Sequence, residues 1–209
     1  MGASTTLDAL TERVIALQHS LGRRAVIGIV GPPGAGKSTL AERLTARVRG
    51  AALLPMDGFH LAQEQLVALG REARKGAPDT FDSAGYIELL RRARRGDGDV
   101  FAPRFDRSIE EPIAAAIRIP ASATLVVTEG NYLMHEGDGW SAVADLLDES
   151  WYLDPPTPLR VERLTRRHVE FGRTPTAAGR WVAEVDERNA RVIERARERC
   201  SLVIETWDD

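Results

Sequence analysis

Residues 31–38, Gly-Pro-Pro-Gly-Ala-Gly-Lys-Ser, constrain the fold of this chain more than any other segment. They match the phosphate-binding pattern G-x-x-x-x-G-K-[ST] at every fixed position. An apolar, β-branched run at residues 25–30 predicts a buried strand before them, and leucines at helical spacing predict a helix after them. Because this pattern binds phosphate between a strand and a helix, a chance glycine-rich turn is the weaker interpretation.

The predicted loop supplies the groups that a nucleotide phosphate needs. Glycines let successive backbone N–H groups surround a phosphate, and the N-terminus of the following helix adds a favourable field. Lys37 would contact the β- and γ-phosphates, and the hydroxyl of Ser38 would bind Mg²⁺. The expected nucleotide-binding residues in this loop are Gly31, Gly34, Ala35, Gly36, Lys37, Ser38 and Thr39.

Composition and charge disfavour several other classes of protein. A chain of 209 residues with 43% hydrophobic and 28% charged residues is typical of one globular α/β domain. The net charge of −3 gives no reason to expect a nucleic-acid or membrane partner, and no apolar run reaches the roughly 18 residues of a transmembrane helix. The only cysteine, Cys200, excludes an intrachain disulfide, so we expect a cytoplasmic protein. The oligomeric state is open, with a homodimer as one option.

Strand patterns alternate with helix patterns, which predicts a three-layer α/β fold with helices on both faces of a parallel sheet. We expect a single domain over residues 1–209, with an acceptor-binding insertion at 57–120 and a lid region at 159–180. Five central strands are predicted, at residues 25–30, 51–54, 125–128, 150–153 and 202–204. The main helices are predicted at residues 7–21, 38–48, 84–95, 140–147, 159–171 and 177–199.

Polar residues follow the second and third predicted strands, at the edge where parallel sheets place ligands. Asp57 would lie opposite the γ-phosphate, where it could accept a proton from a hydroxyl group, although it could also cap the next turn. His60 could bind the acceptor or pack beneath the loop. Glu129 closes a hydrophobic strand, as does the acidic residue that holds Mg²⁺ in phosphate-loop proteins. Asn131 could contact the acceptor or belong to a turn.

Five ordered segments, at residues 31–38, 56–60, 74–82, 103–107 and 129–132, together resemble the phosphoribulokinase/uridine kinase family. The D-G-F sequence at 57–59 and the segment from Lys75 to Asp82 look especially like pantothenate kinase. The whole pattern is most similar to the nucleoside- or fructose-transport-associated kinases of this group. The resemblance implies a P-loop kinase sheet with its five strands in the order 2-3-1-4-5, ATP with Mg²⁺ as the donor, and a small-molecule alcohol as the acceptor.

The resemblance also implies roles for individual residues. Asp57 corresponds to the catalytic base, Lys37 to the catalytic phosphate-binding lysine, and Ser38 and Glu129 to the metal ligands. The segment at 103–107 lacks the histidine that uridine kinases use near this place, so the acceptor is left open. The expected acceptor-binding residues are Asp57, His60, Arg74, Lys75, Phe81, Asp82, Arg104 and Asn131.

Arginines on and after the helix predicted at 159–171 are candidates for a lid. Arg166, Arg167 and Arg173 correspond to the family's lid region and would bind the phosphates of ATP while excluding water. Glu162 and Glu170 offer these arginines an alternative, which is pairing on a solvated helix face.

These observations lead to one hypothesis and two alternatives. The hypothesis is an ATP-dependent kinase that phosphorylates a hydroxyl of a nucleoside, a sugar or a pantothenate-like metabolite. A nucleoside monophosphate kinase would instead need a phosphate pocket, for which Arg71, Arg74 and Arg104 are candidates. A non-catalytic nucleotide sensor would need neither Asp57 nor Glu129, so their joint presence favours an enzyme.

Overall fold

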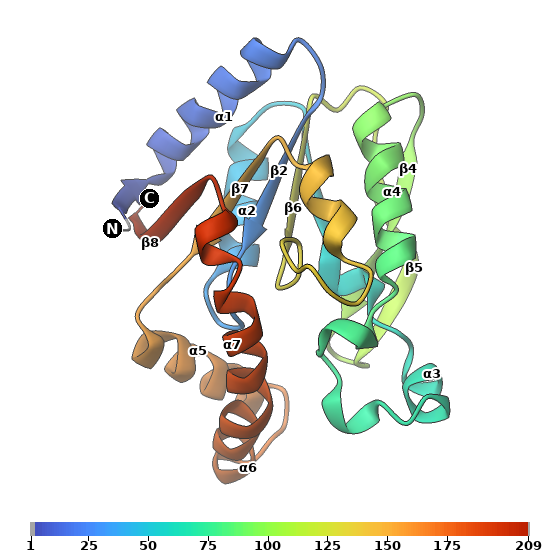
Figure 1. Cartoon of the computed structure of the whole chain (residues 1–209), viewed down its shortest axis with the longest axis vertical. Coiled ribbons are helices and arrows are strands. Elements are labelled where there is room, and N and C mark those ends of the chain that lie inside the picture. The colour runs from blue at the N-terminus through green and yellow to red at the C-terminus, as the bar shows by residue number, and fades with distance from the viewer. Residues whose placement is uncertain (1–2, 209) are drawn as a thin grey trace.

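A computed structural model describes residues 3–208, in which six parallel strands form one sheet in the order β1-β8-β7-β2-β6-β3 (Figure 1). The prediction of five strands is wrong in number, so the order of the whole six-stranded sheet differs from the predicted order 2-3-1-4-5. The five predicted strands stand in the sequence β3-β6-β2-β7-β8, and β1 extends the sheet beyond β8. The sheet strands are β1 (Ala3–Thr6), β2 (Ala25–Val30), β3 (Ala51–Pro55), β6 (Leu125–Gly130), β7 (Glu149–Leu153) and β8 (Leu202–Asp208).

The additional strand, β1, has a sequence that did not predict a strand. Its Ala-Ser-Thr-Thr sequence carries no apolar alternation, and it pairs with β8, which lies about two hundred residues later in the chain. Such a pairing is set by tertiary structure rather than by local preference.

Helices cover both faces of the sheet, because apolar residues of β2 that point to opposite faces are both buried. Val26 and Val30 join a cluster with α4 (Ser83–Arg95) and the short helix η4 (Ser141–Leu146). Ile27 and Ile29 join a second cluster with α1 (Leu7–Leu21) and α2 (Lys37–Arg47). Because successive strand residues point to opposite faces, a strand that is buried on both faces fixes a three-layer arrangement.

The insertion between β3 and β6 contains a β-hairpin that the sequence did not predict. Strands β4 (Val100–Asp106) and β5 (Glu111–Ile119) pair in antiparallel fashion. Prolines at 103 and 112 and the alanine run at 114–116 hide the usual alternation of apolar and polar residues. The remaining helices of the insertion are η1 (Met56–Phe59), α3 (Gln63–Ala68), η2 (Glu72–Arg74) and η3 (Pro78–Thr80).

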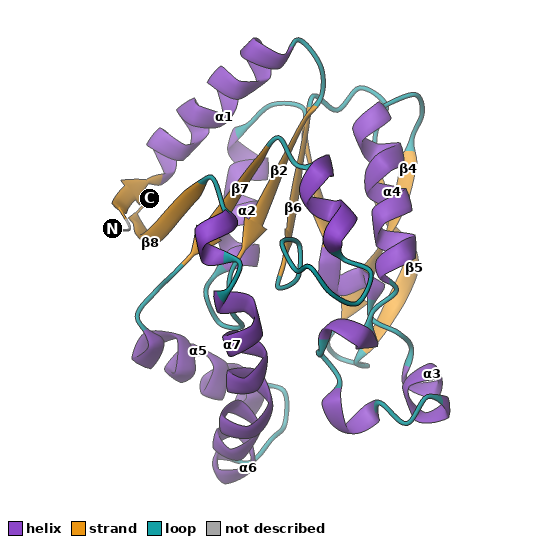
Figure 2. Cartoon of the chain, in the orientation of Figure 1, coloured by secondary structure: helices purple, strands orange, loops and turns teal. Residues whose placement is uncertain are grey.

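The predicted long helix at 177–199 is several shorter helices. A π-helical turn, η5 (Val182–Asp186), interrupts it between α6 (Pro175–Trp181) and α7 (Glu187–Glu194), and η6 (Arg197–Arg199) follows. Figure 2 shows α5 (Thr157–Glu170), α6 and α7 beyond the end of the sheet at which β2 finishes, with α3 across from them. Among the residues that the structure describes, no helix has the length and apolar character needed to span a bilayer.

A buried arginine at the start of β2 fastens the insertion to the sheet. Arg24 is 8% exposed. Its guanidinium donates to the carbonyl oxygens of Ala123 at 2.7 Å, Pro120 at 3.0 Å and Ala121 at 2.6 Å, and also to that of Ala93. One side chain therefore satisfies carbonyls from the end of α4 and from the connection between β5 and β6.

Replacing this arginine should destabilise the protein strongly. Arg24→Met keeps the length of the side chain but leaves buried carbonyls without donors, so we expect a loss of about 2–4 kcal/mol in the free energy of unfolding. Urea denaturation followed by circular dichroism measures this loss. Arg91→Met is the matched control, because Arg91 is exposed on α4 with only a 3.5 Å ion pair to Glu88. It should change stability by no more than about 0.5 kcal/mol, and equal losses in both variants would contradict the role of Arg24.

Candidate functional site

The glycine-rich loop lies between β2 and α2, as predicted, and its backbone requires glycine. Gly34 and Gly36 have φ angles of 79° and 91°, in the left-handed region that other residues rarely adopt. A Cβ atom on Gly34 would also lie 2.7 Å from the carbonyl oxygen of Arg160 on α5. The loop is therefore held between the sheet and α5, with the N-terminus of α2 directed into it.

Lys37 lies buried at the first turn of α2. Its Nζ donates to the carbonyl oxygens of Gly31 at 2.8 Å and Pro32 at 3.1 Å. Burial lowers the pKa of Lys37 to about 8, while the charges of Glu129 and Asp57 act in the opposite direction. An ammonium group has three hydrogens, and the third has no hydrogen-bond acceptor among the residues described here. Lys37 can therefore offer it to a phosphate oxygen.

Ser38 and Glu129 meet beside this lysine because β6 lies next to β2 in the sheet. Ile29 is opposite Glu129 in the parallel register, and the Ser38 hydroxyl donates to Glu129 Oε1 at 3.1 Å. Burial raises the pKa of Glu129 to about 7, and the charge of Asp57 raises it as well, whereas Lys37 and Ser38 lower it.

The donor set of Ser38 and Glu129 fits a magnesium ion. A hydroxyl and a carboxylate are hard oxygen ligands, and a divalent cation would stabilise the ionised form of this buried carboxylate. Among the residues described, no group of three or more histidine, cysteine or acidic side chains could hold a metal ion. Such a site would therefore need further oxygen ligands from water and the nucleotide.

Asp57 follows β3, across from the loop, and pairs with an arginine that the sequence analysis did not select. Arg107 Nη2 lies 2.9 Å from Asp57 Oδ2. Burial raises the pKa of Asp57, but the positive charges of His60, Arg107 and Lys37 lower it by more, so it lies below its ordinary value. Asp57 is therefore an ionised carboxylate at neutral pH.

The predicted acceptor residue Arg104 does not reach the site. Its side chain is 59% exposed and approaches Asp106 at 3.9 Å, and it lines neither cavity described below. Arg107, three residues further along the same motif, takes this place because the hairpin turn carries it toward Asp57. The motif at residues 103–107 indicated the correct segment, but only the geometry of the hairpin shows which of its arginines contacts Asp57.

Two cavities meet at the glycine-rich loop. The first, of about 840 Å³, lies over the loop between α2, α5 and β8. The second, of about 540 Å³, lies between the loop, η1, the hairpin and the α5–α7 region. Gly34, Lys37, Ser38 and Arg167 line both cavities, whereas Asp57 and Glu129 line only the second.

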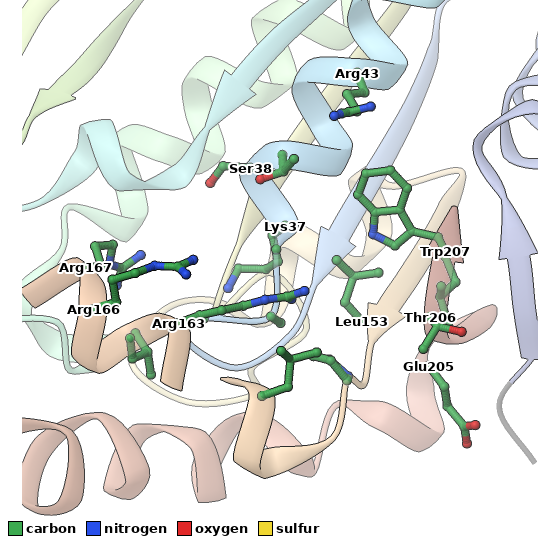
Figure 3. A pocket seen from close by; sticks show the side chains of 18 of the residues that line it. Lys37, Ser38, Arg43, Leu153, Arg163, Arg166, Arg167, Glu205, Thr206 and Trp207 are labelled. Carbon is green, nitrogen blue, oxygen red and sulfur yellow. The ribbon is translucent and has the colours of Figure 1, made fainter. Parts of the chain in front are cut away.

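The first cavity contains most of the predicted phosphate-binding residues and three aromatic or basic residues that were not predicted, Arg43, Arg163 and Trp207. Figure 3 shows Arg163, Arg166 and Arg167 projecting from α5 toward the side of the cavity near Lys37, with Trp207 at the opposite end. The guanidinium of Arg43 lies 5.8 Å from the centre of the Trp207 ring. No motif in the sequence indicated Trp207, because β8 reaches this cavity only through the sheet order, and none indicated Arg43, which lies on α2. The predicted loop residues that line this cavity are Gly34, Ala35, Gly36, Lys37, Ser38 and Thr39; Gly31 contributes the carbonyl that Lys37 contacts.

The three predicted lid arginines have different surroundings. Arg167 faces both cavities, and burial followed by the charge of Arg107 lowers its pKa. Arg166 lines the first cavity and lies 3.9 Å from Glu170 on the exposed face of α5. Arg173 lines the second cavity rather than the first, with its guanidinium 4.1 Å from the Trp181 ring centre. The prediction that Arg173 binds ATP phosphates is therefore not supported by its position.

The second cavity brings together four of the seven predicted acceptor residues other than Asp57. Besides Arg104, Arg74 and Asp82 lie outside it: Arg74 pairs with Asp79, with Nε 3.2 Å from Oδ1, and Asp82 caps α4 by accepting from Gly85 N at 2.8 Å. Both side chains are occupied in holding local structure. The predicted residues that line the cavity are Asp57, His60, Lys75, Phe81 and Asn131, and the unpredicted ones include Phe105, Arg107, His168, Trp181, Asp186 and Asn189.

Comparison with known proteins identifies what this arrangement resembles. The family model described as "Phosphoribulokinase / Uridine kinase family" matches residues 26–209. The "uncharacterized protein YggC" of Escherichia coli strain K12 is 34% identical over 194 residues, which cover 90% of this chain and 80% of that protein. A pantothenate kinase of Corynebacterium glutamicum is 26% identical over 163 residues, covering 75% of this chain and 52% of the kinase.

A solved structure resembles the whole chain. The protein from Silicibacter sp. TM1040, provisionally described as a fructose transport system kinase, superimposes with a TM-score of 0.84 at 32% identity. The superposition covers 98% of each chain. The predicted family and its kinase fold are therefore confirmed.

Substitution of Gly34 should weaken nucleotide binding without unfolding the protein. Gly34→Ala forces a Cβ against the Arg160 carbonyl, so the loop must shift, and we expect the Kd for ATP, measured by isothermal titration calorimetry, to rise at least about tenfold. Gly70→Ala is the control, because Gly70 has a φ of 63° but no atom within 4 Å of the added Cβ. It should cost about 1 kcal/mol of stability while leaving the Kd unchanged, and unchanged binding in both variants would contradict the packing argument.

Proposed function

The chain belongs to the phosphoribulokinase/uridine kinase family, and we propose that it is an ATP-dependent kinase that transfers the γ-phosphoryl group to a hydroxyl of a small metabolite. The observation that carries this proposal is the junction of the two cavities. Lys37 and Arg167 line both cavities, while Asp57 faces only the second. A donor in the first cavity and an acceptor in the second would therefore meet between a phosphate-binding lysine and a carboxylate.

The first cavity has the features that a nucleoside triphosphate needs. Backbone N–H groups at the start of α2 and the Nζ of Lys37 would bind phosphate oxygens, as the sequence predicts. Arg163 and Arg167 of α5 supply further positive charge on the lid side. Trp207, at the far end, offers a flat apolar surface for the base.

Magnesium would be held by the Ser38 hydroxyl and the Glu129 carboxylate, whose oxygen atoms are in hydrogen-bond contact. A bound magnesium ion would neutralise part of the charge on the phosphate oxygens. Glu129 must be ionised to hold it, and the nearby charge of Lys37 favours the ionised form. Ser38 lines both cavities and Glu129 lines the second, so an ion held by both would lie beside the point where the cavities meet.

Asp57 would position the acceptor hydroxyl for attack in line with the leaving group. A carboxylate whose pKa lies below its ordinary value is a weak base, so its main contribution is to hold and orient the hydroxyl before the proton moves. The transition state of phosphoryl transfer is loose, and most of its stabilisation comes from positioning and charge. Lys37, Arg107 and Arg167 surround this point with positive charge.

The acceptor that we propose is a nucleoside, a sugar or a pantothenate-like metabolite. The names of two relatives, a pantothenate kinase and a fructose transport system kinase, support this range. A nucleoside monophosphate kinase is less well supported, because two of the arginines expected to bind the acceptor's phosphate, Arg71 and Arg74, both pair with Asp79. A non-catalytic sensor gives no reason for Asp57 to lie at the junction.

Neutralising Asp57 should remove turnover while preserving ATP binding. We expect Asp57→Asn to lower kcat by about 10²–10⁴-fold on whichever acceptor the wild type uses, because orientation and proton transfer are both impaired. Coupled ADP release with Mg-ATP measures this, using a panel of nucleosides, ketoses, aldoses, pantothenate and nucleoside monophosphates. The KM for ATP should change by less than about threefold, since Asp57 lies outside the first cavity.

The matched control is Asp97→Asn, which removes an exposed carboxylate that pairs with Arg95 at 3.3 Å and lines neither cavity. It should retain the wild-type kcat. Full activity in Asp57→Asn would exclude Asp57 as the positioning base. A wild type that binds ATP tightly but turns over no acceptor would instead favour the sensor.

A further inference from the structure

Three successive carbonyl groups of the glycine-rich loop accept hydrogen bonds from cationic side chains. The first two accept from Lys37, and the third, that of Pro33, accepts from Arg160 Nη1 at 3.3 Å. The peptide bond between Pro33 and Gly34 is trans, so the carbonyl of Pro33 and the N–H of Gly34 point in opposite directions. A side chain that holds this carbonyl therefore also sets the direction of the Gly34 N–H.

The N–H of Gly34 is placed to bind a phosphate oxygen. Gly34 lines both cavities, and its N–H donates to no acceptor among the residues that the structure describes. Backbone N–H groups bind phosphate well only when several of them converge on it, so a loop whose peptide units can rotate binds less tightly. The contact that fixes the Pro33 carbonyl thus bears on phosphate affinity.

Arg160 reaches the loop from a buried position on α5. It is 3% exposed and lines neither cavity. Its Nη2 lies 2.6 Å from Glu187 Oε1, in an ion pair without the geometry of a hydrogen bond. A guanidinium group is forked, so one side chain can hold a carbonyl and a carboxylate at the same time. Because a buried charge needs an opposite charge beside it, Glu187 stabilises Arg160 in this position.

Glu187 connects this ion pair to the wall of the second cavity. It is the first residue of α7 and lines neither cavity, whereas Asp186 and Asn189 on either side of it line the second. Asp186 Oδ2 also lies 2.8 Å from Nε2 of His168 on α5. Two polar contacts therefore join α5 to the start of α7, and one of them continues through Arg160 to the loop.

We propose that Arg160 is a positioning residue that orients the Gly34 N–H for phosphate, and that it does so only while Glu187 pairs with it. Neither charged side chain would touch a ligand, since neither lines a cavity. Phosphate affinity in the first cavity is then set in part by α7, which contributes to the wall of the second. This inference rests on the proposed function, because it takes the loop to be the ATP site, and it adds the means by which that loop is held.

The test measures the binding of ATP and of tripolyphosphate, which has phosphate groups but no base, by isothermal titration calorimetry. Arg160→Met keeps the length of the side chain but loses both contacts, so we expect the Kd for each ligand to rise about tenfold. The two increases should agree within about twofold, because the defect lies in the loop and not at the base. Arg160→Lys keeps a charge on one nitrogen atom that cannot hold both partners, so each Kd should still rise at least about threefold.

Glu187→Gln tests the contribution of α7 while Arg160 is retained. The amide keeps the shape of the carboxylate but not its charge, so we expect the Kd for ATP to rise about threefold. Adding Glu187→Gln to Arg160→Met should change the Kd by less than about twofold beyond Arg160→Met alone, because the two side chains act as one unit. Each titration is carried out well below the unfolding temperature of the variant, so that a loss of stability alone does not alter the Kd.

Arg188→Met is the matched control, because Arg188 is exposed on α7 next to Glu187 and lines neither cavity. It should leave both Kd values unchanged. Unchanged Kd values in the Arg160 variants, a rise for ATP without one for tripolyphosphate, or additive effects of the Arg160 and Glu187 substitutions would each overturn the inference and leave the kinase function intact. If Arg160→Met does not fold, Arg160→Lys and Glu187→Gln decide the outcome. A wild type that binds neither ligand would overturn both the inference and the proposed function.

Discussion

The buried ammonium group of Lys37 is the feature on which the rest of the site depends. A charge removed from water is stable only when opposite charges and hydrogen-bond acceptors surround it. Two loop carbonyls accept from its Nζ, and the carboxylates of Glu129 and Asp57 lie close enough to raise its pKa against the effect of burial. These groups come from the ends of β2, β3 and β6, which are neighbours in the sheet. The order of the strands in the sheet therefore brings together the charges that balance the buried ammonium group.

The same arrangement explains why the site has two compartments. Residues of α5 line the first cavity beside the loop, and the hairpin carries Arg107 to Asp57 at the edge of the second. Helix α7 is tied to the insertion as well, because the carbonyl oxygen of Gly76 accepts from Tyr132 Oη at 2.6 Å and from Asn189 Nδ2 at 3.3 Å. Segments from both halves of the chain thus form the second cavity, so its shape depends on the packing of the whole domain.

The sequence predicted the parts of this structure that depend on local patterns. The loop at 31–38 carries its own signature, and Asp57 and Glu129 each follow an apolar strand, so their placement at one edge followed from parallel pairing. The β4–β5 hairpin depends instead on pairing between two irregular strands, and it decides that Arg107, not Arg104, faces Asp57. Trp207 reaches the first cavity only because β8 stands beside β7. Such contacts between distant residues have no signature in a single sequence.

A crystal structure with a non-hydrolysable ATP analogue and Mg²⁺ tests the central claim most directly. The account predicts the base near Trp207, the γ-phosphate beside Lys37, and an open path from that phosphate to Asp57 through the second cavity. The metal ion should contact the oxygen atoms of Ser38 and Glu129, directly or through water. A nucleotide bound with its base in the second cavity, or with its γ-phosphate directed away from Asp57, would contradict the assignment of donor and acceptor sites.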